Sequence, residues 1–256
     1  MGSQRKTRSL WFRTAAFLPM PFASRFLSAA IVCLAGFLLA SGPVAAQAPP
    51  APATLDIQLM QKADQLSNEG KYSEAAAAYE QLVTKYPQVA SVPEANFRGG
   101  YAHYLAGEYD EAIAAFKRVL DNKNLPPELA QLAELSLSMT PQVLAAKAAK
   151  LPANDPARKV ALGDAVKQFD IYLQKFPKSD EVESATYGKA LALFQLTQYE
   201  PAIEALRGNL TRFAQSPTVQ DSQYLLALTL ATLANVALQK ATAVDKTADA
   251  NYDEAE

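Results

Sequence analysis

Apolar residues along this chain recur three or four residues apart, in short runs separated by glycine or proline. This spacing places them on one face of an α-helix. The first two runs are Leu55, Leu59, Ala63 and Leu66, and then Ala75, Tyr79, Leu82 and Val83. Valine, isoleucine and threonine form no alternating runs of the kind that predict a β-strand, and alanine, a strong helix former, is abundant. The pattern therefore predicts an all-α protein.

A skeleton of four positions organises the helical runs. A turn glycine is followed two residues later by an aromatic residue, then by an alanine and then by a second aromatic residue. The complete copies are Gly70, Tyr72, Ala75, Tyr79 and Gly107, Tyr109, Ala112, Phe116. Weaker copies open at Leu162 and Tyr199, and a fifth opens at Tyr252. The openings are alternately 37 and 53 residues apart, which indicates duplication of a unit of 90 residues.

The breaks between the runs predict where helices begin and end. Proline ends a helix because it lacks the amide proton that the helix needs, but it is tolerated in the first turn. The helices of the first unit are expected to run from Leu55 to about Gly70, from Lys71 or Ser73 to Pro87, from Pro93 to Gly107 and from Tyr109 to Leu120.

The 53-residue gap predicts longer helices. We expect helical segments over 128–138 and 143–151, kinked or divided at Pro141. The equivalent stretch 90 residues further on lacks an internal proline and predicts one long helix over 219–240. The copy at Tyr252 is expected to open another second helix.

Two antiparallel helices pack closely only where one of them offers small residues. The candidates are Ala63, Gly100 and Ala190 in the first helices of the pairs and Ala75, Ala112, Ala165 and Ala202 in the second helices. Tyr79, Phe116 and Phe169 are expected to fill the space between successive pairs. No pair can bury its apolar face alone, so the pairs are predicted to stack into an α-solenoid over 55–256.

Residues 1–46 have the composition of an export signal. Their positive charges, with no acidic residue among them, are Arg5, Lys6, Arg8, Arg13 and Arg25. An apolar run over 26–40 and then small residues follow, which is typical of a signal peptide. Cleavage after Ala46 or after Ala48 fits this order. An uncleaved membrane anchor is the alternative, although about 20 apolar residues usually span a bilayer. Residues 47–54, rich in proline and alanine, are predicted to form a linker.

Charge narrows the classes of partner. The chain has 24 basic and 26 acidic residues, and loss of the five N-terminal cations leaves the remainder more acidic. This balance argues against binding of nucleic acid through its phosphates. The single cysteine, Cys33, lies in the apolar run, so the exported part is expected to contain no disulfide. A periplasmic or exported location is predicted, with membrane contact only through the signal segment if it stays uncleaved.

The skeleton resembles that of the tetratricopeptide repeat family. The resemblance covers roughly 55–256 and rests on Ala63, Gly70, Tyr72, Ala75, Tyr79 and Pro87, and on Gly100, Gly107, Tyr109, Ala112 and Phe116. The copy at Leu162 lacks both the turn glycine and the tyrosine, and Thr197 replaces the glycine before Tyr199. Together with the export signal, the pattern looks most like periplasmic members of bacterial envelopes. The resemblance implies a superhelix whose first helices line a concave groove that holds a partner's peptide or helix.

The candidate residues for this groove are aromatic residues of the first helices, namely Phe97, Tyr101, Tyr104, Tyr187 and Phe194. Tyrosine suits a binding surface because its ring is apolar and its hydroxyl forms hydrogen bonds. Packing in the core between repeats is the alternative for several of them. Some family members grip a C-terminal carboxylate with a lysine–asparagine–arginine clamp. Met60 and Asp64 stand where the first two clamp residues are expected, so this mode is not predicted here.

The sequence offers no pattern typical of an enzyme. His103 has no second histidine or nearby cysteine with which to form a zinc site, and nothing local supports a nucleophile–histidine pair. The acidic pairs Asp110-Glu111 and Asp253-Glu254 open second helices, where negative charge suits the helix end. Gly99-Gly100 lies inside a predicted helix, so it is not a phosphate loop. We therefore predict no catalytic residue, no cofactor and no metal.

The leading hypothesis from the sequence is a non-enzymatic protein–protein interaction scaffold of the periplasm or cell envelope. One alternative is the repeat portion of a longer envelope assembly factor or enzyme. Another is a cell-wall glycan-binding module that uses the tyrosines of the groove.

Overall fold

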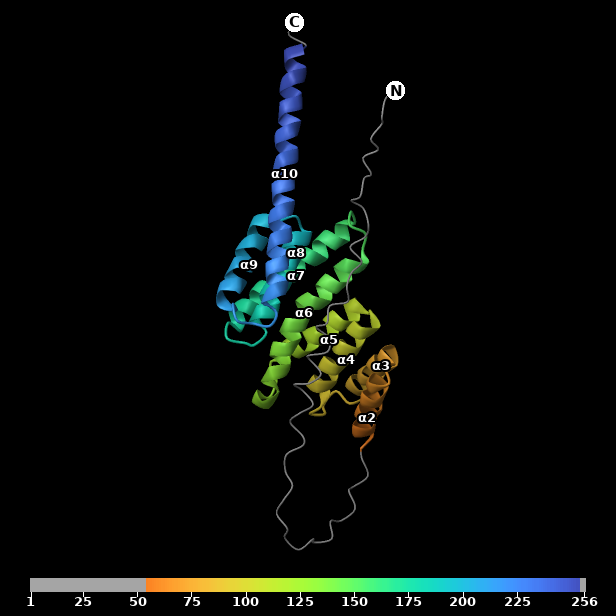
Figure 1. Cartoon of the computed structure of the whole chain (residues 1–256). Helices are drawn as coiled ribbons and strands as arrows, with labels where there is room; N and C mark the ends of the chain where they lie inside the picture. The colour runs from red at the N-terminus through yellow and green to blue at the C-terminus, as the bar shows by residue number, and fades with distance from the viewer. Residues whose placement is uncertain (1–53, 254–256) are drawn as a thin grey trace, which may run out of the picture. The chain divides into compact units, whose positions relative to one another are not determined.

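A computed structural model of the chain describes residues 54–253, with side chains described up to residue 242. The predicted signal peptide and almost all of the predicted linker lie outside these residues. The described part is helical and contains no strand (Figure 1). Its elements are α2 (Leu55–Asn68), α3 (Tyr72–Lys85), α4 (Val92–Ala106), α5 (Tyr109–Leu120), the short 3-10 helix η2 (Pro127–Leu129), α6 (Ala130–Lys150), α7 (Pro156–Lys175), α8 (Val182–Gln195), α9 (Tyr199–Arg212) and α10 (Val219–Asp253).

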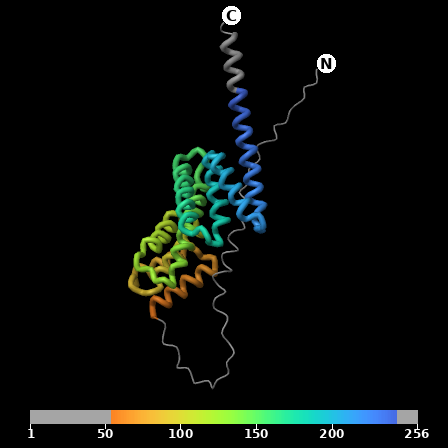
Figure 2. The backbone as a smooth tube through the Cα atoms, turned by 90° about the vertical axis from the view of Figure 1, so that its left-hand side faces the viewer, coloured from red at the N-terminus to blue at the C-terminus, as the bar shows by residue number. Residues whose placement is uncertain are grey.

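The helices pack with their neighbours in sequence, as the repeat pattern predicts. The first helices of the pairs are α2, α4, α6 and α8, and their second helices are α3, α5, α7 and α9. Each second helix also packs on the first helix of the next pair, so that layers follow one another (Figures 1 and 2). Smaller contacts join successive first helices, such as α4 with α6, and join η2 to α6. The fold is therefore an α-solenoid, whose units contact only their neighbours.

The predicted small residues lie at the helix contacts. Ala63, Ala75, Ala112, Ala165, Ala190 and Ala202 are all fully buried. A Cβ atom added to Gly100 would lie 2.9 Å from the ring of Phe116, so the α4–α5 contact leaves no room for a side chain. Tyr79, Phe116 and Phe169 are buried as predicted.

The turn between the helices of a pair has the same geometry in three pairs. Gly70, Gly107 and Thr197 each follow a first helix with a positive φ, of 75°, 83° and 61°. After α4, the amide of Glu108 donates to the carbonyl of His103 and that of Gly107 to Tyr104, at 2.9 and 3.1 Å. The same two bonds occur around Gly70 and Thr197. They form the Schellman motif, which satisfies the last carbonyls of a helix.

Of the two effects predicted for Pro141, a kink or a division of the segment, helix α6 shows that the division is wrong. It is one helix of 21 residues with Pro141 buried inside it. Side-chain hydrogen bonds flank the Leu137 carbonyl, which Pro141 leaves without its helical donor: Thr140 Oγ1 donates to Ser136 O at 2.8 Å and Gln142 Nε2 to Ser138 O at 3.2 Å. Packing on both α5 and α7 further holds the helix together across the missing hydrogen bond.

The ends of the last helices are partly as predicted. The side chain of Asp155 caps α7 by accepting a hydrogen bond from the amide of Ala157 at 2.8 Å.

Helix α10 begins at Val219, as expected, but continues to Asp253 instead of ending near residue 240. The expectation that Tyr252 opens a separate second helix is therefore wrong in this structure. Beyond its contact with α8 and α9, α10 extends past both helices (Figures 1 and 2).

Candidate partner-binding surface

The five aromatic residues predicted to line a groove lie in two clusters at equivalent places in the two 90-residue units. The first aromatic cluster consists of Phe97, Tyr101 and Tyr104 of α4 and Tyr109 and Ile113 of α5, packed against Met139 and Val143 of α6. The second aromatic cluster consists of Tyr187, Leu191 and Phe194 of α8, packed against Leu206 and Leu225, with Tyr199 of α9 beside Phe194. Each cluster thus lies where one pair of helices meets the first helix of the next.

The rings within the clusters contact one another at tilted angles. The ring centroids of Tyr101 and Tyr104 are 6.2 Å apart, and those of Tyr104 and Tyr109 are 6.3 Å apart. In the second aromatic cluster, Phe194 and Tyr199 are 5.8 Å apart. These distances are in the range that aromatic pairs favour. All five predicted residues are partly buried, so each contributes to the packing between repeats and also reaches the surface.

The tyrosine hydroxyls of the clusters are available for new hydrogen bonds. Those of Tyr101, Tyr104 and Tyr187 have no partner among the described residues and are not enclosed. Partial burial raises the pKa of each of these tyrosines, which keeps the hydroxyls protonated. In contrast, Tyr79 donates to Asp64, and Tyr172 donates to Ser179 at 2.8 Å. The tyrosines of the clusters therefore differ from the tyrosines of the core.

His103 belongs to a group of polar side chains, partly buried and partly exposed, that sequence reasoning missed. The His103 cluster consists of Ser73 and Glu80 from α3, Asn96 and His103 from α4, Glu108 from the turn and Arg118 from α5. The imidazole Nδ1 lies 2.6 Å from Glu108 Oε2, and Nε2 lies 3.7 Å from Glu80 Oε1. Glu80 and then Glu108 raise the pKa of His103, against the opposing effect of burial.

The arrangement of the His103 cluster does not activate a nucleophile. The hydroxyl of Ser73 donates to Glu108 Oε1 at 2.8 Å, so the carboxylate, and not the imidazole, receives the serine proton. A serine nucleophile needs the histidine next to its hydroxyl. Arg118 donates to Asn96 at 2.6 Å and also pairs with Glu80, which ties α3, α4 and α5 together. The hydrogen bonds and ion pairs of the His103 cluster thus hold two neighbouring repeats together.

The carboxylate of Asp64 is bound by side chains of the fold, not by a ligand. It pairs with Arg98 at 2.7 Å, and it accepts the hydrogen bond of Tyr79. Arg98 also pairs with Glu94 at 2.5 Å. A carboxylate offers no hydrogen-bond donor to a ligand carboxylate, and the partners of Asp64 are residues of the fold.

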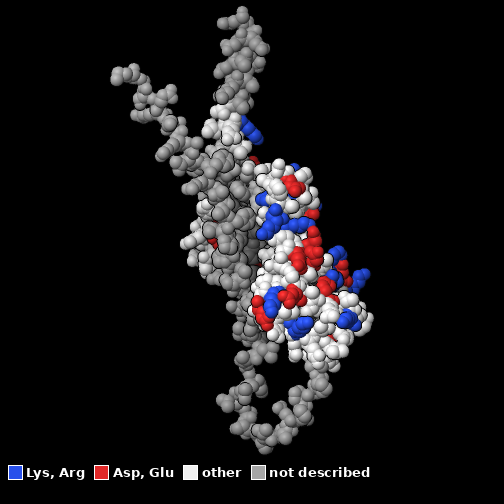
Figure 3. Space-filling model, turned by 90° about the vertical axis from the view of Figure 1, so that its right-hand side faces the viewer, with Lys and Arg blue, Asp and Glu red and all other residues white. Residues whose placement is uncertain are grey.

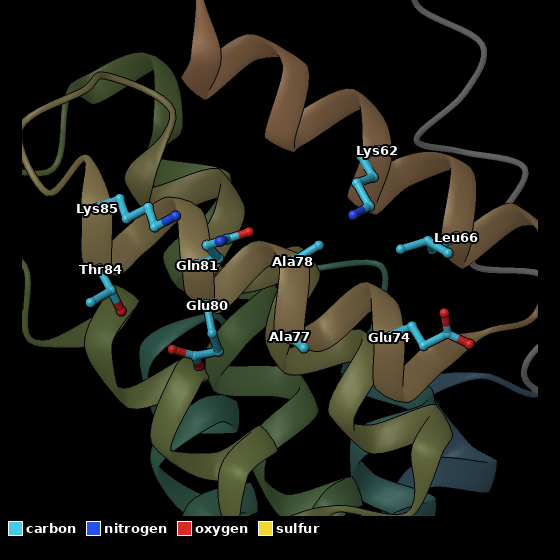
Figure 4. A pocket seen from close by; sticks show the side chains of 9 residues that line it. All are labelled: Lys62, Leu66, Glu74, Ala77, Ala78, Glu80, Gln81, Thr84 and Lys85. Atoms are coloured by element: carbon cyan, nitrogen blue, oxygen red, sulfur yellow. The ribbon is translucent and has the colours of Figure 1, made fainter.

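The described side chains on the face seen in Figure 3 show no large area of one charge. Basic and acidic side chains are interspersed over the face seen in Figure 3. An open depression of about 600 Å³ lies between α2 and α3 (Figure 4). Its lining includes Lys62, Glu74 and Lys85 around the apolar Leu66 and Ala78. This mixed lining does not select a particular ligand.

Two further features bear on metal ions and membranes. Within residues 54–242, no three His, Cys, Asp or Glu side chains are grouped so that they could hold a metal ion. One helical stretch of the described chain, Val219–Thr242 in α10, is long and apolar enough to cross a membrane, judged by length and composition alone. Its mean hydropathy is 1.3.

Among solved structures, the chain is similar to three that contain helical repeats. MamA 41-end from Desulfovibrio magneticus RS-1 has a TM-score of 0.49 and 15% identity, with 74% of this chain and 98% of that chain covered. The MamA RS-1 ArsTM double mutant has a TM-score of 0.48 and 14% identity, with 70% and 95% covered. The TPR2AB-domain:pHSP90 complex of yeast Sti1 has a TM-score of 0.27 and 15% identity, with 68% and 85% covered. No curated protein matches the chain in sequence.

The family is indicated by a match over the two complete copies of the skeleton. Residues 60–126 match the family model described as tetratricopeptide repeat. In the structure these residues span α3, α4 and α5 and most of α2, including both glycine turns of the first unit. The helix pairs continue in the same order through α9. Residues 60–126 are therefore similar in sequence to tetratricopeptide repeats, and the helix pairs that follow them are packed in the same order.

Proposed function

We propose that the chain is a non-enzymatic protein–protein interaction scaffold that holds a peptide or helix of a partner protein against the two aromatic clusters. The observation that carries this proposal is the repetition of the clusters. Tyr104 and Phe194, like Phe97 and Tyr187, are 90 residues apart in sequence and lie at the same junction of the two units. A core needs only apolar residues at such a junction, whereas these clusters also present tyrosine hydroxyls without partners.

The chemistry of the clusters suits a protein segment. A partly buried tyrosine offers a large rigid ring at a small cost in side-chain entropy, together with a hydrogen-bond donor, and such residues often dominate binding energy. Two equivalent clusters favour a partner long enough to contact both. The absence of a field of one charge in Figure 3 favours a segment of mixed charge over a nucleic acid.

A photo-crosslinking experiment tests the binding surface. Replacing Tyr104 or Tyr187 by p-benzoylphenylalanine in the producing cell is expected to crosslink a protein partner on irradiation. The matched control is Tyr224, which is 73% exposed and lies outside both clusters. If the probe at Tyr224 gives the same crosslinked bands, or neither cluster position gives any, the proposed surface is wrong.

The open tyrosine rings also suit stacking on a sugar, which keeps the cell-wall glycan as a second candidate. Titration of the protein with soluble peptidoglycan fragments distinguishes the two. Binding that is lost in Tyr104→Ala and kept in Tyr224→Ala supports the glycan. No binding at millimolar concentration removes it.

We also propose export to the periplasm or cell envelope, supported by the composition of residues 1–46. Mass spectrometry of the protein from a bacterial host tests this directly. A mature N-terminus at Gln47 or Pro49 is expected, from cleavage after Ala46 or Ala48. An intact N-terminus at Met1, on protein recovered from the cytoplasm, would disprove the proposed export. It would leave the proposed binding surface unaffected.

A further inference from the structure

Helix α10 exposes a face that the corresponding helix of the first unit buries. Sliding the chain by 90 residues places α6 on the first part of α10. In α6, Leu137 and Ala148 are 6% and 0% exposed and pack on α7, against Phe169 and Leu162 respectively. The equivalent residues of α10 are Ala227 and Leu238, and both are exposed, Leu238 to 63%.

The opposite side of α10 is firmly attached to the preceding pair. Ser222, Leu225 and Thr229 are buried against α8 and α9. Asn209 of α9 donates from Nδ2 to Ser222 Oγ at 3.1 Å. Helix α10 therefore takes the place of the first helix of a fifth pair. Within the described residues, no second helix covers its other side.

The order of residues on the uncovered face of α10 is symmetric about Ala234. Its residues lie at Ala234 and at three, four and seven positions on either side of it, which places them on one face of the helix. In order they are Ala227, Leu230, Ala231, Ala234, Ala237, Leu238 and Ala241. All seven are exposed in the structure, and none carries a charge.

We propose that this face binds the same face of a second copy of the chain, with the two α10 helices antiparallel. A two-fold axis at Ala234 sets Leu230 of one copy opposite Leu238 of the partner and sets alanine opposite alanine elsewhere. Such self-complementarity is what a two-fold interface requires. The central alanines permit close approach of the two helices, and the leucines on either side fill the space next to them. Each α10 then lies beside the other in the place that α7 takes beside α6.

The surroundings of α10 favour this occupant over a lipid bilayer. The stretch Val219–Thr242 is apolar enough to span a membrane, but spanning would release Ser222 and its neighbours from α8 and α9. Between the apolar face and the side packed on α8 and α9, α10 carries Asp221, Asn235 and Gln239, all exposed to solvent, together with Leu228, which is 39% exposed. A single uncovered face with a polar side beside it suits a helix pair better than a bilayer, which surrounds a helix on all sides.

The association state of the compact unit over 52–256 tests the proposal. Light scattering and sedimentation are expected to show a dimer whose stability changes little with salt, because the face is uncharged. Ala234→Glu places two carboxylates at the axis and is expected to weaken dimerisation by at least about tenfold, from like-charge repulsion across a close contact. The matched control, Gln239→Glu, adds the same charge to the polar side of α10 and is expected to leave the dimer intact.

A disulfide reports the position of the axis. The only cysteine of the chain, Cys33, lies outside the unit tested, so Ala234→Cys is expected to form one intermolecular bridge under mild oxidation. Gln239→Cys is expected to form none. A monomer without an Ala234→Cys bridge at about 100 μM, or a dimer that survives Ala234→Glu, would overturn the proposal. Flotation of the unit with lipid vesicles, lost in Ala234→Glu, would instead show that a bilayer covers the face.

Discussion

Thr197 stands where the other two turns of the same kind have glycine. Its φ of 61° is the one positive φ of a residue other than glycine among residues 54–253. A β-branched side chain is strained there, because its Cβ approaches the backbone carbonyl, by about 1–2 kcal/mol. We predict that Thr197→Gly raises the free energy of unfolding by about 0.5–1 kcal/mol, after the greater entropy of glycine in the unfolded chain is offset.

Urea denaturation measures this change, and Gly107→Ala is its counterpart. Gly107 has a φ of 83° and nothing within 4 Å of an added Cβ, so the loss of stability there isolates backbone strain from packing. We expect a loss of about 1 kcal/mol. If Thr197→Gly destabilises the protein, the side chain of Thr197 contributes more than the strain that it causes.

His103 makes stability depend on pH in a predictable direction. Glu80 and Glu108 raise its pKa in the folded state above the ordinary value of 6.5. A folded state that binds the proton more tightly is stabilised most below the unfolded pKa, and this stabilisation is lost as pH rises through the folded pKa. We therefore expect the urea midpoint to fall with increasing pH from about 6.5 upward, and to fall less in His103→Gln.

The measurement is clean because the chain contains one histidine. Its imidazole proton signal can be followed by NMR without ambiguity, and a midpoint above 6.5 is expected. Glu80→Gln removes one of the two carboxylates and is expected to lower that midpoint. A midpoint at or below 6.5 would show that burial outweighs both carboxylates.

At the scale of the element, two glycines inside helices should respond in opposite ways to alanine. A Cβ added to Gly188 of α8 would lie 2.6 Å from the ring of Phe169, which is buried in the α7–α8 contact. Overpacking of this kind costs about 1–3 kcal/mol, more than the gain in helix propensity. Gly208 of α9 has nothing within 4 Å, so Gly208→Ala should stabilise by about 0.5–1 kcal/mol.

Thermal and urea unfolding of the two variants give the comparison. A stabilised Gly188→Ala would mean that Phe169 can move aside and that the α7–α8 contact is looser than the structure indicates. The pair of variants separates helix propensity, which acts in both, from packing, which acts only at Gly188.

The helix boundaries show what a single sequence can predict and what it cannot. The turns at Gly70 and Gly107, the limits of α5 and the start of α10 follow from local residues, because turn glycines and prolines act within a few positions. The predicted division at Pro141 was wrong, since the effect of the proline depends on the packing of α6 against α5 and α7. Helix α10 continues past its contacts with α8 and α9, because residues 241–253 contain no glycine or proline that would end it.

At the scale of the whole molecule, the repeat register carried most of the information about the site. It sets Phe97 on Tyr187, and in the structure Phe97, Tyr101 and Tyr104 lie in one cluster and Tyr187 and Phe194 in its equivalent, while their role in a groove stays a prediction. The His103 cluster was missed because its members come from three helices and are not related by the register. Arg118 and Glu80 lie 38 residues apart in sequence, and no local pattern links them.

A chain of layers that touch only their neighbours should also lose structure locally. Ala75 of α3 and Ala202 of α9 are both fully buried at the contacts within their pairs, near opposite ends of the described chain. Ala75→Leu overpacks the first contact by about 1–3 kcal/mol. Hydrogen exchange is expected to rise in α2 and α3, less in α4, and not at all in α8 and α9, because each repeat is coupled only to the next. Ala202→Leu is the mirror-image control, which should raise exchange in α8 and α9 and spare α2 and α3. A uniform rise in hydrogen exchange from α2 to α9 in both variants would mean that the stack unfolds as one cooperative unit. In that case α6 and α7, the longest paired helices of the stack, transmit the disturbance between its two halves.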